Sequence, residues 1–508
     1  MYDLVDPLIL RVQMNILYAA SETVPFAKTG GLGDVSNSLP KALAKLGNTV
    51  RVVLPAYRQA FQSGQPITDL HTEIAVPVND RVVKGNLLES RIPNSDVQVI
   101  LIQNDHYFDR AGLYNENEQD YGDNCERFVF FSRAVLELID AMQWEIDVLH
   151  TNDWQTGLVP AYLKIFYRDK PLYSKIATLH TIHNLAYQGI FWHWDMPLTG
   201  IDWKYFTFDK MEFHGKLNML KTGVVFADGI STVSPRYAQE IQTSEYGCAM
   251  ESVLQYRKDS LRGILNGICT EAWNPGTDPF IAAPFTTEDV FEKKPICKAA
   301  LQKEMGLDEN PETPLLGVVG RLASQKGIDL ILETAPDWIR NHNVQYCFLG
   351  SGDSYIENQL AQLQAEFPRN VAVRLTFSNE LAHKIEAGSD MFLMPSRYEP
   401  CGLNQMYSQL YGTIPIVHET GGLADTVVDT NEATIADGTA SGFSFVLESA
   451  HELNLTLWRA LHCFCDRPGI WRQIMLTCMK LDWSWTRSAR QYLDFYEELA
   501  RAASEPQS

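Results

Sequence analysis

The chain has 508 residues, of which 45% are hydrophobic and 21% charged, and its formal net charge is −21. This length exceeds what one hydrophobic core usually serves, so we expect two domains of about 200 to 270 residues each. The negative charge argues against a nucleic-acid or anionic-membrane partner, because proteins that bind either normally carry a basic surface. Any anionic ligand must therefore be held by a local cluster of cations.

The nine cysteines and the N-terminal segment bear on the compartment. The cysteines are odd in number and scattered, and none form a C-x-x-C pair, which indicates a reducing environment without a structural zinc. Residues 1–13 are acidic where transit peptides are basic, and no apolar run reaches the roughly 18 positions that a bilayer-spanning helix needs. We therefore expect a cytoplasmic protein without a membrane partner or a cofactor; the alternative is the plastid stroma after removal of a transit peptide.

Short apolar runs alternate with amphipathic stretches along the first half of the chain, which is the pattern of a parallel α/β sheet. Buried strands are predicted at residues 15–20, 49–54, 97–103, 146–150 and 175–179. A helix is predicted between the first two strands, because Val35, Leu39 and Leu43 fall at helical spacing. Gly47 should end this helix, and Pro40 should kink it.

The same pattern restarts after Pro311 and predicts a second Rossmann-like sheet. Its strands are expected at residues 315–320, 345–349, 371–375, 391–395 and 414–418. Residues 271–303 are rich in Pro, Thr, Asp and Lys and show little periodicity, so we place a linker near residues 265–284. An amphipathic helix is predicted at residues 487–503, followed by a frayed tail at 504–508.

One phrase occurs in both halves, as Thr29-Gly30-Gly31-Leu32-Gly33-Asp34 and as Thr420-Gly421-Gly422-Leu423-Ala424-Asp425. A glycine pair that leads into a helix can bring backbone N–H groups against a phosphate, and the helix dipole favours the anion. Two such phrases suggest two domains that share one phosphorylated ligand. A nicotinamide-dependent dehydrogenase fits poorly, because the third glycine of its fingerprint would fall at Ser36 and no acid follows the next strand.

Cations and an unusual acid follow the strands of the second half. Arg321 and Lys326 stand at the end of a predicted strand, where ligands of α/β sheets bind, and together they could neutralise a diphosphate without a metal. The alternative is a pair of solvated surface cations. Gly350 and Gly352 follow the next strand and form either a loop whose backbone can approach a ligand closely or a plain turn. Glu399 lies between two prolines at a strand end, where it could contact a ligand, cap the following helix, or do both.

Polar and aromatic residues suited to a sugar follow two strands of the first half. These are Asn152-Asp153-Trp154 and the stretch from Thr181 to Gly189, which share one predicted sheet edge. A lone histidine such as His183 is usually a core residue, but its expected place beside Asp153 favours a role in a site. His180 and His183 lack a matching carboxylate or cysteine cluster, so no metal site is expected.

Taken together, four stretches resemble the bacterial glycogen synthases and plant starch synthases, the retaining glucosyltransferases that use ADP-glucose. They are Lys28–Asp34, His183–Gly189, Ser396–Leu403 and Thr420–Asp425, and the resemblance runs from about Asn15 to Tyr496. It implies an α/β fold with two Rossmann-like domains facing across a cleft, the glycosyltransferase-B (GT-B) architecture. The implied domains are residues 1–265 and 266–484, with a C-terminal helix at 485–508 that returns to the first domain.

The implied activity is transfer of glucose from ADP-glucose to the non-reducing end of an α-1,4-glucan, with retention of configuration and release of ADP. A catalytically silent glucan-binding homologue that acts in assembly or priming is the alternative. A glycogen phosphorylase shares the two-domain plan, but it is much longer and needs a lysine-bound pyridoxal cofactor. The oligomeric state is left open.

The resemblance also implies roles for individual residues. Glu399 would hold the transferred glucose, His183 and Asp153 would orient it, and Arg321 and Lys326 would bind the diphosphate. The residues expected to bind the donor are Lys28, Gly30, Gly31, Asp34, Asn266, Gly350, Gly352, Phe377, Cys401, Gly402, Leu403, Thr420, Gly421 and Gly422. Those expected to line the acceptor path are Tyr107, Phe108, Trp154, Asn184, Tyr187 and Gln188.

Two positions compare informatively with the family pattern. Cys269 stands where the family usually has Asp, so no carboxylate can act there. Tyr407 occupies the place where related transferases carry a second acid, as it does in the synthases.

Overall fold

A computed structural model describes residues 13–117 and 119–505 and divides the chain into two compact units. Unit 1 contains the chain up to Val233, Ala238–Asn266, and the segment from Trp485 onward; unit 2 contains Ser234–Tyr237 and Gly267–Ser484. The expectations made for residues 1–12 and 506–508 lie outside the described ranges. Within those ranges, no helix combines the length and hydrophobicity needed to cross a bilayer.

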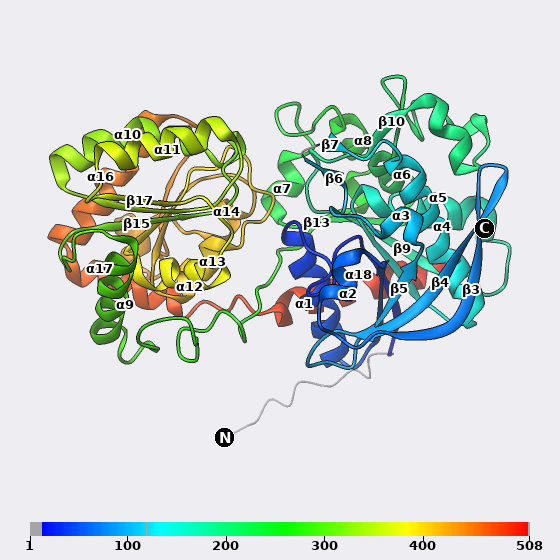
Figure 1. The fold of residues 1–508 in the computed structure, drawn as a ribbon, viewed down its shortest axis with the longest axis horizontal. Coiled ribbons are helices and arrows are strands. Elements are labelled where there is room, and N and C mark those ends of the chain that lie inside the picture. Colours follow the sequence, from blue (N-terminus) through cyan, green and yellow to red (C-terminus); the bar gives the residue numbers. More distant parts are fainter. Residues whose placement is uncertain (1–12, 118, 506–508) are drawn as a thin grey trace. The chain divides into compact units, whose positions relative to one another are not determined.

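Unit 1 is built on a nine-stranded sheet in the order β14-β13-β9-β8-β1-β2-β5-β4-β3. Strands β13, β9, β5, β4 and β3 of this sheet are labelled in Figure 1. The strands are β1 (Asn15–Ala19), β2 (Thr49–Pro55), β3 (Thr68–Val78), β4 (Arg81–Arg91), β5 (Gln98–Gln103), β8 (Val148–Asn152), β9 (Ala177–Ile182), β13 (Gly229–Thr232) and β14 (Leu261–Gly263). All pair in parallel except β3 and β4, which form an antiparallel hairpin at one edge. The five predicted strands are confirmed to within three residues at each end; the edge hairpin was not predicted.

Helices and two small sheets complete unit 1. The helices are α1 (Gly31–Lys45), α2 (Arg58–Gln62), α3 (Asp105–Phe108), α4 (Asn124–Met142), α5 (Val159–Tyr162), α6 (Met219–Phe226), α7 (Pro235–Glu240, which begins in unit 2), α8 (Glu251–Tyr256) and α18 (Trp485–Ser504). The small sheets pair β6 (Asn115–Glu116) with β7 (Gln119–Asp120), and β12 (Lys216–Asn218) with both β10 (Ile190–Trp192) and β11 (Glu212–Phe213).

Two predicted helices of unit 1 are confirmed as α1 and α18. Helix α1 ends at Lys45, and Gly47 follows in the left-handed conformation with φ of 92°. The helix runs through Pro40 as one element. Helix α18 packs against α1 and β9, and its Tyr496 hydroxyl lies 2.6 Å from Nδ1 of His150 on β8. The last helix of the chain is therefore part of the core of unit 1.

Unit 2 is built on six parallel strands in the order β17-β16-β15-β18-β19-β20. They are β15 (Leu315–Val319), β16 (Gln345–Leu349), β17 (Val371–Arg374), β18 (Met391–Met394), β19 (Ile414–His418) and β20 (Phe443–Phe445). The five predicted strands are confirmed to within one residue, and the order is that of the doubly wound Rossmann fold. The predicted α/β class with two Rossmann-like sheets is therefore confirmed.

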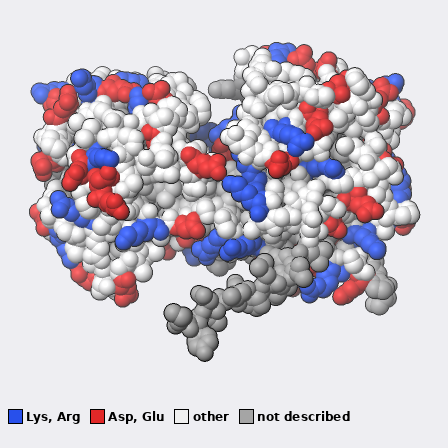
Figure 2. Space-filling model, turned by 90° about the horizontal axis from the view of Figure 1, so that it is seen from below, with Lys and Arg blue, Asp and Glu red and all other residues white. Residues whose placement is uncertain are grey.

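Helices cover both faces of this sheet, with α10, α11 and α16 on one face and α9, α12 and α13 on the other (Figure 1). The helices of unit 2 are α9 (Val290–Met305), α10 (Ile328–His342), α11 (Ser354–Glu366), α12 (Asn379–Gly388), α13 (Asn404–Leu410), α14 (Gly421–Thr426), α15 (Glu432–Ala436), α16 (Ala450–Asp466) and α17 (Pro468–Met479). Lys and Arg lie among Asp and Glu on the face seen in Figure 2, so neither sign of charge covers it alone.

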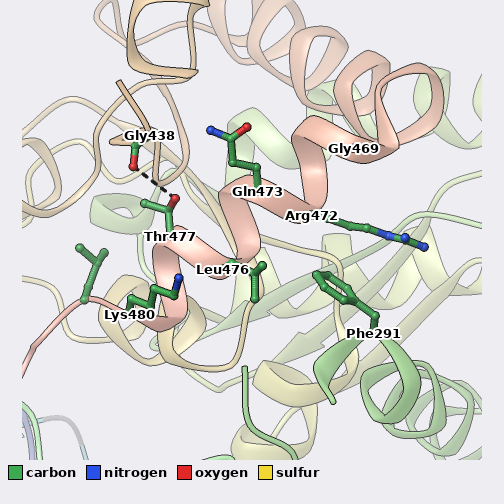
Figure 3. Close-up of a pocket in the computed structure, with 9 residues that line it drawn as sticks. Phe291, Gly438, Gly469, Arg472, Gln473, Leu476, Thr477 and Lys480 are labelled. Carbon is green, nitrogen blue, oxygen red and sulfur yellow. Dashed lines mark hydrogen bonds between the residues drawn. The ribbon is translucent and has the colours of Figure 1, made fainter. Parts of the chain in front are cut away.

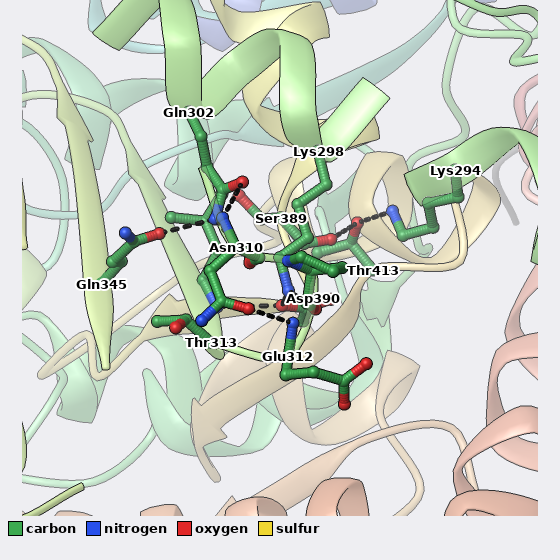
Figure 4. Close-up of polar contacts among 12 residues, drawn as sticks. Lys294, Lys298, Gln302, Asn310, Glu312, Thr313, Gln345, Ser389, Asp390 and Thr413 are labelled. Carbon is green, nitrogen blue, oxygen red and sulfur yellow. Dashed lines mark hydrogen bonds and ion pairs between the residues drawn. The ribbon is translucent and has the colours of Figure 1, made fainter. Parts of the chain in front are cut away.

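Residues 271–303, for which the weak periodicity predicted no helix, contain helix α9 from Val290 onward. The buried face of α9 mixes Lys294, Lys298 and Gln302 with apolar side chains such as Leu301 and Met305, so its hydrophobic periodicity is weak. Figure 4 shows how these residues are paired: Nζ of Lys294 donates to Oγ1 of Thr413 at 2.6 Å, and Nζ of Lys298 lies 2.7 Å from Oδ2 of Asp390. Polar contacts, which pattern analysis does not detect, therefore add to the apolar contacts that hold this helix to the rest of unit 2.

We predict that Lys298→Met lowers the free energy of unfolding of the protein by about 3 kcal/mol, because it leaves the largely buried carboxylate of Asp390 without its cation. The measurement is urea denaturation followed by circular dichroism. Lys293→Met is the matched control, since Lys293 lies on the same helix but forms an exposed pair with Asp289, for which about 1 kcal/mol or less is expected. Equal losses in the two variants would contradict a special role for the buried pair.

Candidate functional site

The strand order of each sheet reverses at one point, and the candidate residues follow the strands on either side of it. In unit 1 the reversal lies between β1 and β8, so the loops after these strands diverge and leave a crevice at the carboxyl edge. The Lys28–Asp34 loop follows β1, and Asp153 follows β8 directly. In unit 2 the reversal lies between β15 and β18, which are followed by Arg321 and by Glu399.

A carboxylate that the sequence analysis overlooked organises the Lys28–Asp34 loop. Glu22 is 4% exposed, and its Oε2 accepts hydrogen bonds from the backbone N–H groups of Thr29 at 2.6 Å and Gly30 at 3.1 Å. Its Oε1 accepts from the Thr29 hydroxyl at 2.6 Å and from the Tyr114 hydroxyl at 2.9 Å. Four donors thus converge on one buried acid. Its position three residues after β1 was the available signal, because it follows the same rule that identified Asp153.

These contacts correct the expected chemistry of the first glycine pair. The N–H group of Gly30 was expected to face a phosphate, but it faces the carboxylate of Glu22, since a buried anion needs donors and the loop supplies them. A Cβ built on Gly30 or Gly31 would meet no atom within 4 Å. These glycines therefore leave open space beside the loop, which a ligand could approach.

Lys28 precedes helix α1, Asp34 lies in the first turn of that helix, and the two side chains pair with each other. Nζ of Lys28 is 2.8 Å from Oδ1 of Asp34, and both side chains remain partly exposed. Burial raises the pKa of Asp34, with Lys28 opposing the rise. The loop thus presents one cation and one carboxylate beside the open face of its glycines.

Asp153 occupies a strained backbone position. Its φ of 55° and ψ of −174° fall in a region that is nearly restricted to glycine and that costs about 1–3 kcal/mol for other residues. Its Oδ1 accepts the backbone N–H of His183 at 2.7 Å, which joins the ends of β8 and β9. Burial raises the pKa of Asp153 to about 7. The fold therefore holds a partly charged carboxyl in a conformation that is unfavourable for stability.

The ring of His183 is neutral, and its tautomer is set by Asn152. The Asn152 amide donates to the carbonyl of Ala19 at 3.0 Å, so its Oδ1 is left to accept from Nε2–H of His183 at 2.8 Å and from the Tyr18 hydroxyl at 3.0 Å. Nδ1 of His183 is then the acceptor nitrogen of the ring. Burial lowers the pKa of His183 to about 3, so the ring carries no charge at neutral pH.

The residues expected along the acceptor path fall into three groups. Tyr107 and Phe108 are 2% and 0% exposed and pack among core aromatic rings, so they offer no surface to a glucan and the role expected for them is not supported. Gln188 is 7% exposed, with Nε2 bound to the carbonyl of Cys248 and Oε1 to Asn218. Both ends of its amide are therefore used inside unit 1.

The remaining acceptor candidates lie nearer the surface. Tyr187 is 52% exposed, and Asn184 is partly exposed in a turn in which its Oδ1 accepts from the N–H of Ala186 at 3.0 Å. Trp154 packs on Phe191 with ring centroids 5.7 Å apart.

Asn266, a donor candidate at the end of the Ala238–Asn266 segment of unit 1, is 5% exposed, and its Oδ1 is buried without a hydrogen-bond partner in the described structure. Such an orphaned acceptor is unfavourable and marks a position suited to a ligand donor.

In unit 2, the two sides of the strand reversal are joined by an ion pair. Nζ of Lys326, in the 3₁₀ turn Ser324–Lys326 after β15, lies 2.5 Å from Oε2 of Glu399 after β18. The same oxygen accepts from the hydroxyl of Ser396 at 3.1 Å. Glu399 is 7% exposed, whereas Arg321 is exposed. The structure therefore brings Lys326 and Glu399 together at the predicted sheet edge.

The second glycine pair differs from the first in its surroundings. A Cβ on Gly421, where φ is 46°, would lie 2.0 Å from the carbonyl oxygen of Glu399, and one on Gly422 would lie 2.0 Å from that of Cys401. The N–H group of Gly422 donates to the Glu399 carbonyl at 3.0 Å and is not directed at a ligand. Glycine is required here because the Thr420–Gly422 segment packs directly on the backbone of the Glu399 loop.

Other donor candidates of unit 2 show the same close packing. Gly350 and Gly352 lie against the backbone of the loop after β15, where added Cβ atoms would approach the carbonyl oxygens of Gly320 and Leu322 to 1.9 and 2.4 Å. Phe377, after β17, is 81% exposed. Gly402 has φ of 68° and Cys401 is buried, while Leu403 directly precedes α13.

A separate pocket of about 620 Å³ lies along α17 in unit 2 (Figure 3). Phe291, Arg472 and Leu476 are among the residues that line it, and none of the predicted site residues does. The hydroxyl of Thr477 donates to the carbonyl of Gly438 at its wall, at 3.4 Å. This pocket is therefore not the predicted sheet-edge site.

Comparisons with known proteins connect this geometry to a family. A family model described as starch synthase catalytic domain matches residues 15–256, and one described as glycosyl transferases group 1 matches residues 302–461. The chain is similar to the glycogen synthase of Rhodopirellula baltica, with 44% identity over 493 residues that cover 95% of this chain and 97% of that protein. The glycogen synthase of Thermotoga maritima is 43% identical over 489 residues, which cover 96% and 99%.

Solved structures agree with these matches. The catalytic domain of starch synthase IV from Arabidopsis thaliana, bound to ADP and acarbose, has a TM-score of 0.89 at 33% identity and covers 96% of this chain and 100% of that one. Sucrose-phosphate synthase from Thermosynechococcus elongatus has a TM-score of 0.59 at 17% identity, with the same shares covered. The second likeness concerns the fold alone.

We predict that Asp153→Asn stabilises the protein at pH 8 while lowering its activity. A carboxyl whose pKa is raised to about 7 destabilises the folded state increasingly as pH rises from about 4 to 7, because the unfolded chain ionises first, and the effect is constant above that range. The gain should be on the order of 2 kcal/mol at pH 8 and should shrink towards pH 5. Thermal unfolding from pH 5 to 8 measures it, and Asp96→Asn, at an exposed position, is the control. A gain that did not change with pH would refute this explanation.

Proposed function

Because the chain belongs to the glycogen and starch synthase family, we propose that it transfers glucose from ADP-glucose to the non-reducing end of an α-1,4-glucan. The family makes it a glycosyltransferase, as the four sequence motifs predicted. We propose that transfer retains the α configuration and releases ADP. The observation that carries this proposal is the Lys326–Glu399 pair, which places a cation and a carboxylate 2.5 Å apart at the strand reversal of unit 2.

The leaving group explains the cations of unit 2. When the bond between C1 of glucose and the diphosphate breaks, negative charge develops on ADP and positive charge on the sugar, and the protein must stabilise both. In our proposal, Lys326 and Arg321 neutralise the diphosphate, Lys326 as a point charge and Arg321 through forked hydrogen bonds. A diphosphate near Lys326 competes with Glu399 for its ammonium group, so donor binding and release of this carboxylate are coupled.

Carboxylates in unit 1 suit the opposite charge. The charge of Glu22 helps to raise the pKa of both Asp34 and Asp153, so this part of unit 1 has a negative potential. Such a potential favours a sugar that gains positive charge in the transition state. His183 is neutral and does not oppose it, and its Nδ1 can accept a hydrogen bond from a sugar hydroxyl.

We assign Glu399 an electrostatic and positioning role toward the transferred glucose. Attack on the face from which the diphosphate leaves preserves the α configuration, and a leaving phosphate oxygen can take the proton of the acceptor hydroxyl. No side chain then has to act as the general base. Glu399 is held by Lys326 and Ser396, which fixes its carboxylate in one place.

The remaining donor and acceptor roles form part of the same proposal. Phe377, which is 81% exposed, is suited to stack on adenine, and Tyr187, together with the partly buried Trp154, offers aromatic surface to the acceptor sugar. Lys28, Asn266 and the open backbone surface at Gly30 and Gly31 complete the proposed donor set. We also propose the domain boundaries 1–265, 266–484 and 485–508, supported by the division of contacts between the two units, and a cytoplasmic location, supported by the bacterial relatives.

The first test is transfer of labelled glucose from ADP-glucose or UDP-glucose onto glycogen, with digestion of the product by an α-1,4-specific amylase. We expect amylase-sensitive growth from ADP-glucose and loss of that growth in Glu399→Ala. No transfer from either donor, with glycogen still bound, would favour the silent glucan-binding homologue instead. The comparisons give that alternative no support.

A second test concerns the leaving group. We predict that Lys326→Ala lowers kcat, because the diphosphate loses its nearest cation. The activation free energy should rise by about 2–4 kcal/mol. Lys384→Ala is the control, since Lys384 belongs to the same unit but pairs with Glu304 and Glu380 on the surface. A near-normal rate for Lys326→Ala would remove this residue from the site.

A further inference from the structure

We propose that unit 1 carries a second glucan-binding surface, formed by the rings of Trp192, Trp194, Trp203 and Phe206, which we call the aromatic ladder. Trp192, Trp194 and Trp203 are 61%, 59% and 45% exposed. Exposed apolar side chains are ordinary when single, but a contiguous group of this kind marks a binding surface. The proposal rests on the proposed function for the identity of the ligand, an α-1,4-glucan chain.

The four rings contact one another in sequence order. The centroids of Trp192 and Trp194 are 6.4 Å apart, those of Trp194 and Trp203 are 5.9 Å apart, and those of Trp203 and Phe206 are 5.4 Å apart. Successive planes meet at 72° or 73°, so the rings form edge-to-face steps. A stepped series of aromatic faces suits a ligand made of repeated apolar faces along a curved chain, and an α-1,4-glucan is such a ligand.

The ladder stands on an ordered frame, so its exposure is built into the fold. Trp192 ends strand β10, which pairs with β12 in antiparallel register. The 3₁₀ segment His193–Thr199 carries Trp194 and is anchored by Met196 and Thr199, both fully buried. The hydroxyl of Thr199 donates to the carbonyl of Met196 at 2.7 Å. Rings held in this way lose little conformational entropy when a sugar stacks on them.

Charge and position favour a glucan over other occupants. Residues 190–206 contain only Asp195, Asp202 and Lys204 as charged residues, so this stretch is close to neutral in a chain whose net charge is −21, and glucan is neutral. The ladder also continues the candidate acceptor segment. Phe191, between Ile190 and Trp192 on β10, packs on Trp154, and Tyr187 lies just before this strand.

A second copy of the chain is the competing occupant, and the size of the patch disfavours it. A standard protein interface needs about 20 to 30 residues a side. The ladder offers four rings, and polar or charged residues such as His193, Asp195 and Asp202 lie between them in the sequence. A sugar chain needs only a few stacking platforms with hydrogen-bonding groups beside them.

The experiment is affinity electrophoresis of the full-length protein in gels containing glycogen, which reads binding without turnover. We expect the triple variant Trp192→Ala, Trp194→Ala, Trp203→Ala to bind glycogen on the order of ten-fold more weakly. In transfer assays its KM for glycogen should rise by a similar factor, while kcat with maltotriose stays unchanged, because a short acceptor need not reach the ladder. The corresponding triple Trp→Phe variant keeps aromatic faces and should retain most of the binding.

Trp458→Ala is the matched control, since Trp458 is a 56% exposed tryptophan on α16 in unit 2. Unchanged glycogen binding in a triple alanine variant with a normal thermal melt overturns the proposal, and so does an equal loss in Trp458→Ala. Dissociation of a wild-type oligomer in the triple variant, with glycogen binding unchanged, assigns the ladder to a second copy and also overturns it. Absence of glucose transfer in the wild-type protein would contradict the proposed function alone. The gel assay measures glycogen binding without turnover and so still tests whether the aromatic ladder binds glucan.

Discussion

Parallel strands send their connecting loops away at the same edge, and in each unit the reversal of strand order separates two of these loops. The residues of the proposed reaction lie around these two places, β1 with β8 in unit 1 and β15 with β18 in unit 2. The backbone pairing of the sheets therefore decides which side chains can meet. It brings Asp153 to the N–H of His183, and it brings Lys326 to Glu399, although 73 residues separate the latter pair in the sequence.

The two glycine phrases show that one sequence pattern can satisfy two different physical demands. In the first, a buried carboxylate from Glu22 takes the N–H groups of Thr29 and Gly30, and the glycines face open space. In the second, glycine is required because Gly421 and Gly422 touch the backbone of the Glu399 loop. The first pair thus shapes a surface, and the second fixes the position of a charged side chain.

The sequence predicted the features that depend on local pattern. Buried parallel strands are apolar on both faces, so β16 and β19 were located to the residue, and Asp153, His183 and Glu399 follow strand ends as predicted. Features that depend on tertiary partners were missed. Helix α9 buries Lys294 and Lys298, whose partners come from distant loops, and Glu22 became significant only once the loop seven residues later folded onto it. The acceptor role expected for Tyr107 and Phe108 is not supported, because both rings are buried. Aromatic residues near a sheet edge pack into the core as readily as they contact a ligand.

Unit 1 maintains several unfavourable features in one place, and their combination argues for selection by function. A strained backbone at Asp153, a carboxyl whose pKa burial raises, and the buried charge of Glu22, which must recruit four donors, each require structure that a stability optimum would avoid. Glu22 and the ionised fraction of Asp153 place negative charge beside the neutral ring of His183. If the transferred sugar becomes positive before the acceptor bond forms, this preorganised charge lowers the barrier without any movement at the moment of reaction. The stability lost in the ground state is then regained as attraction in the transition state.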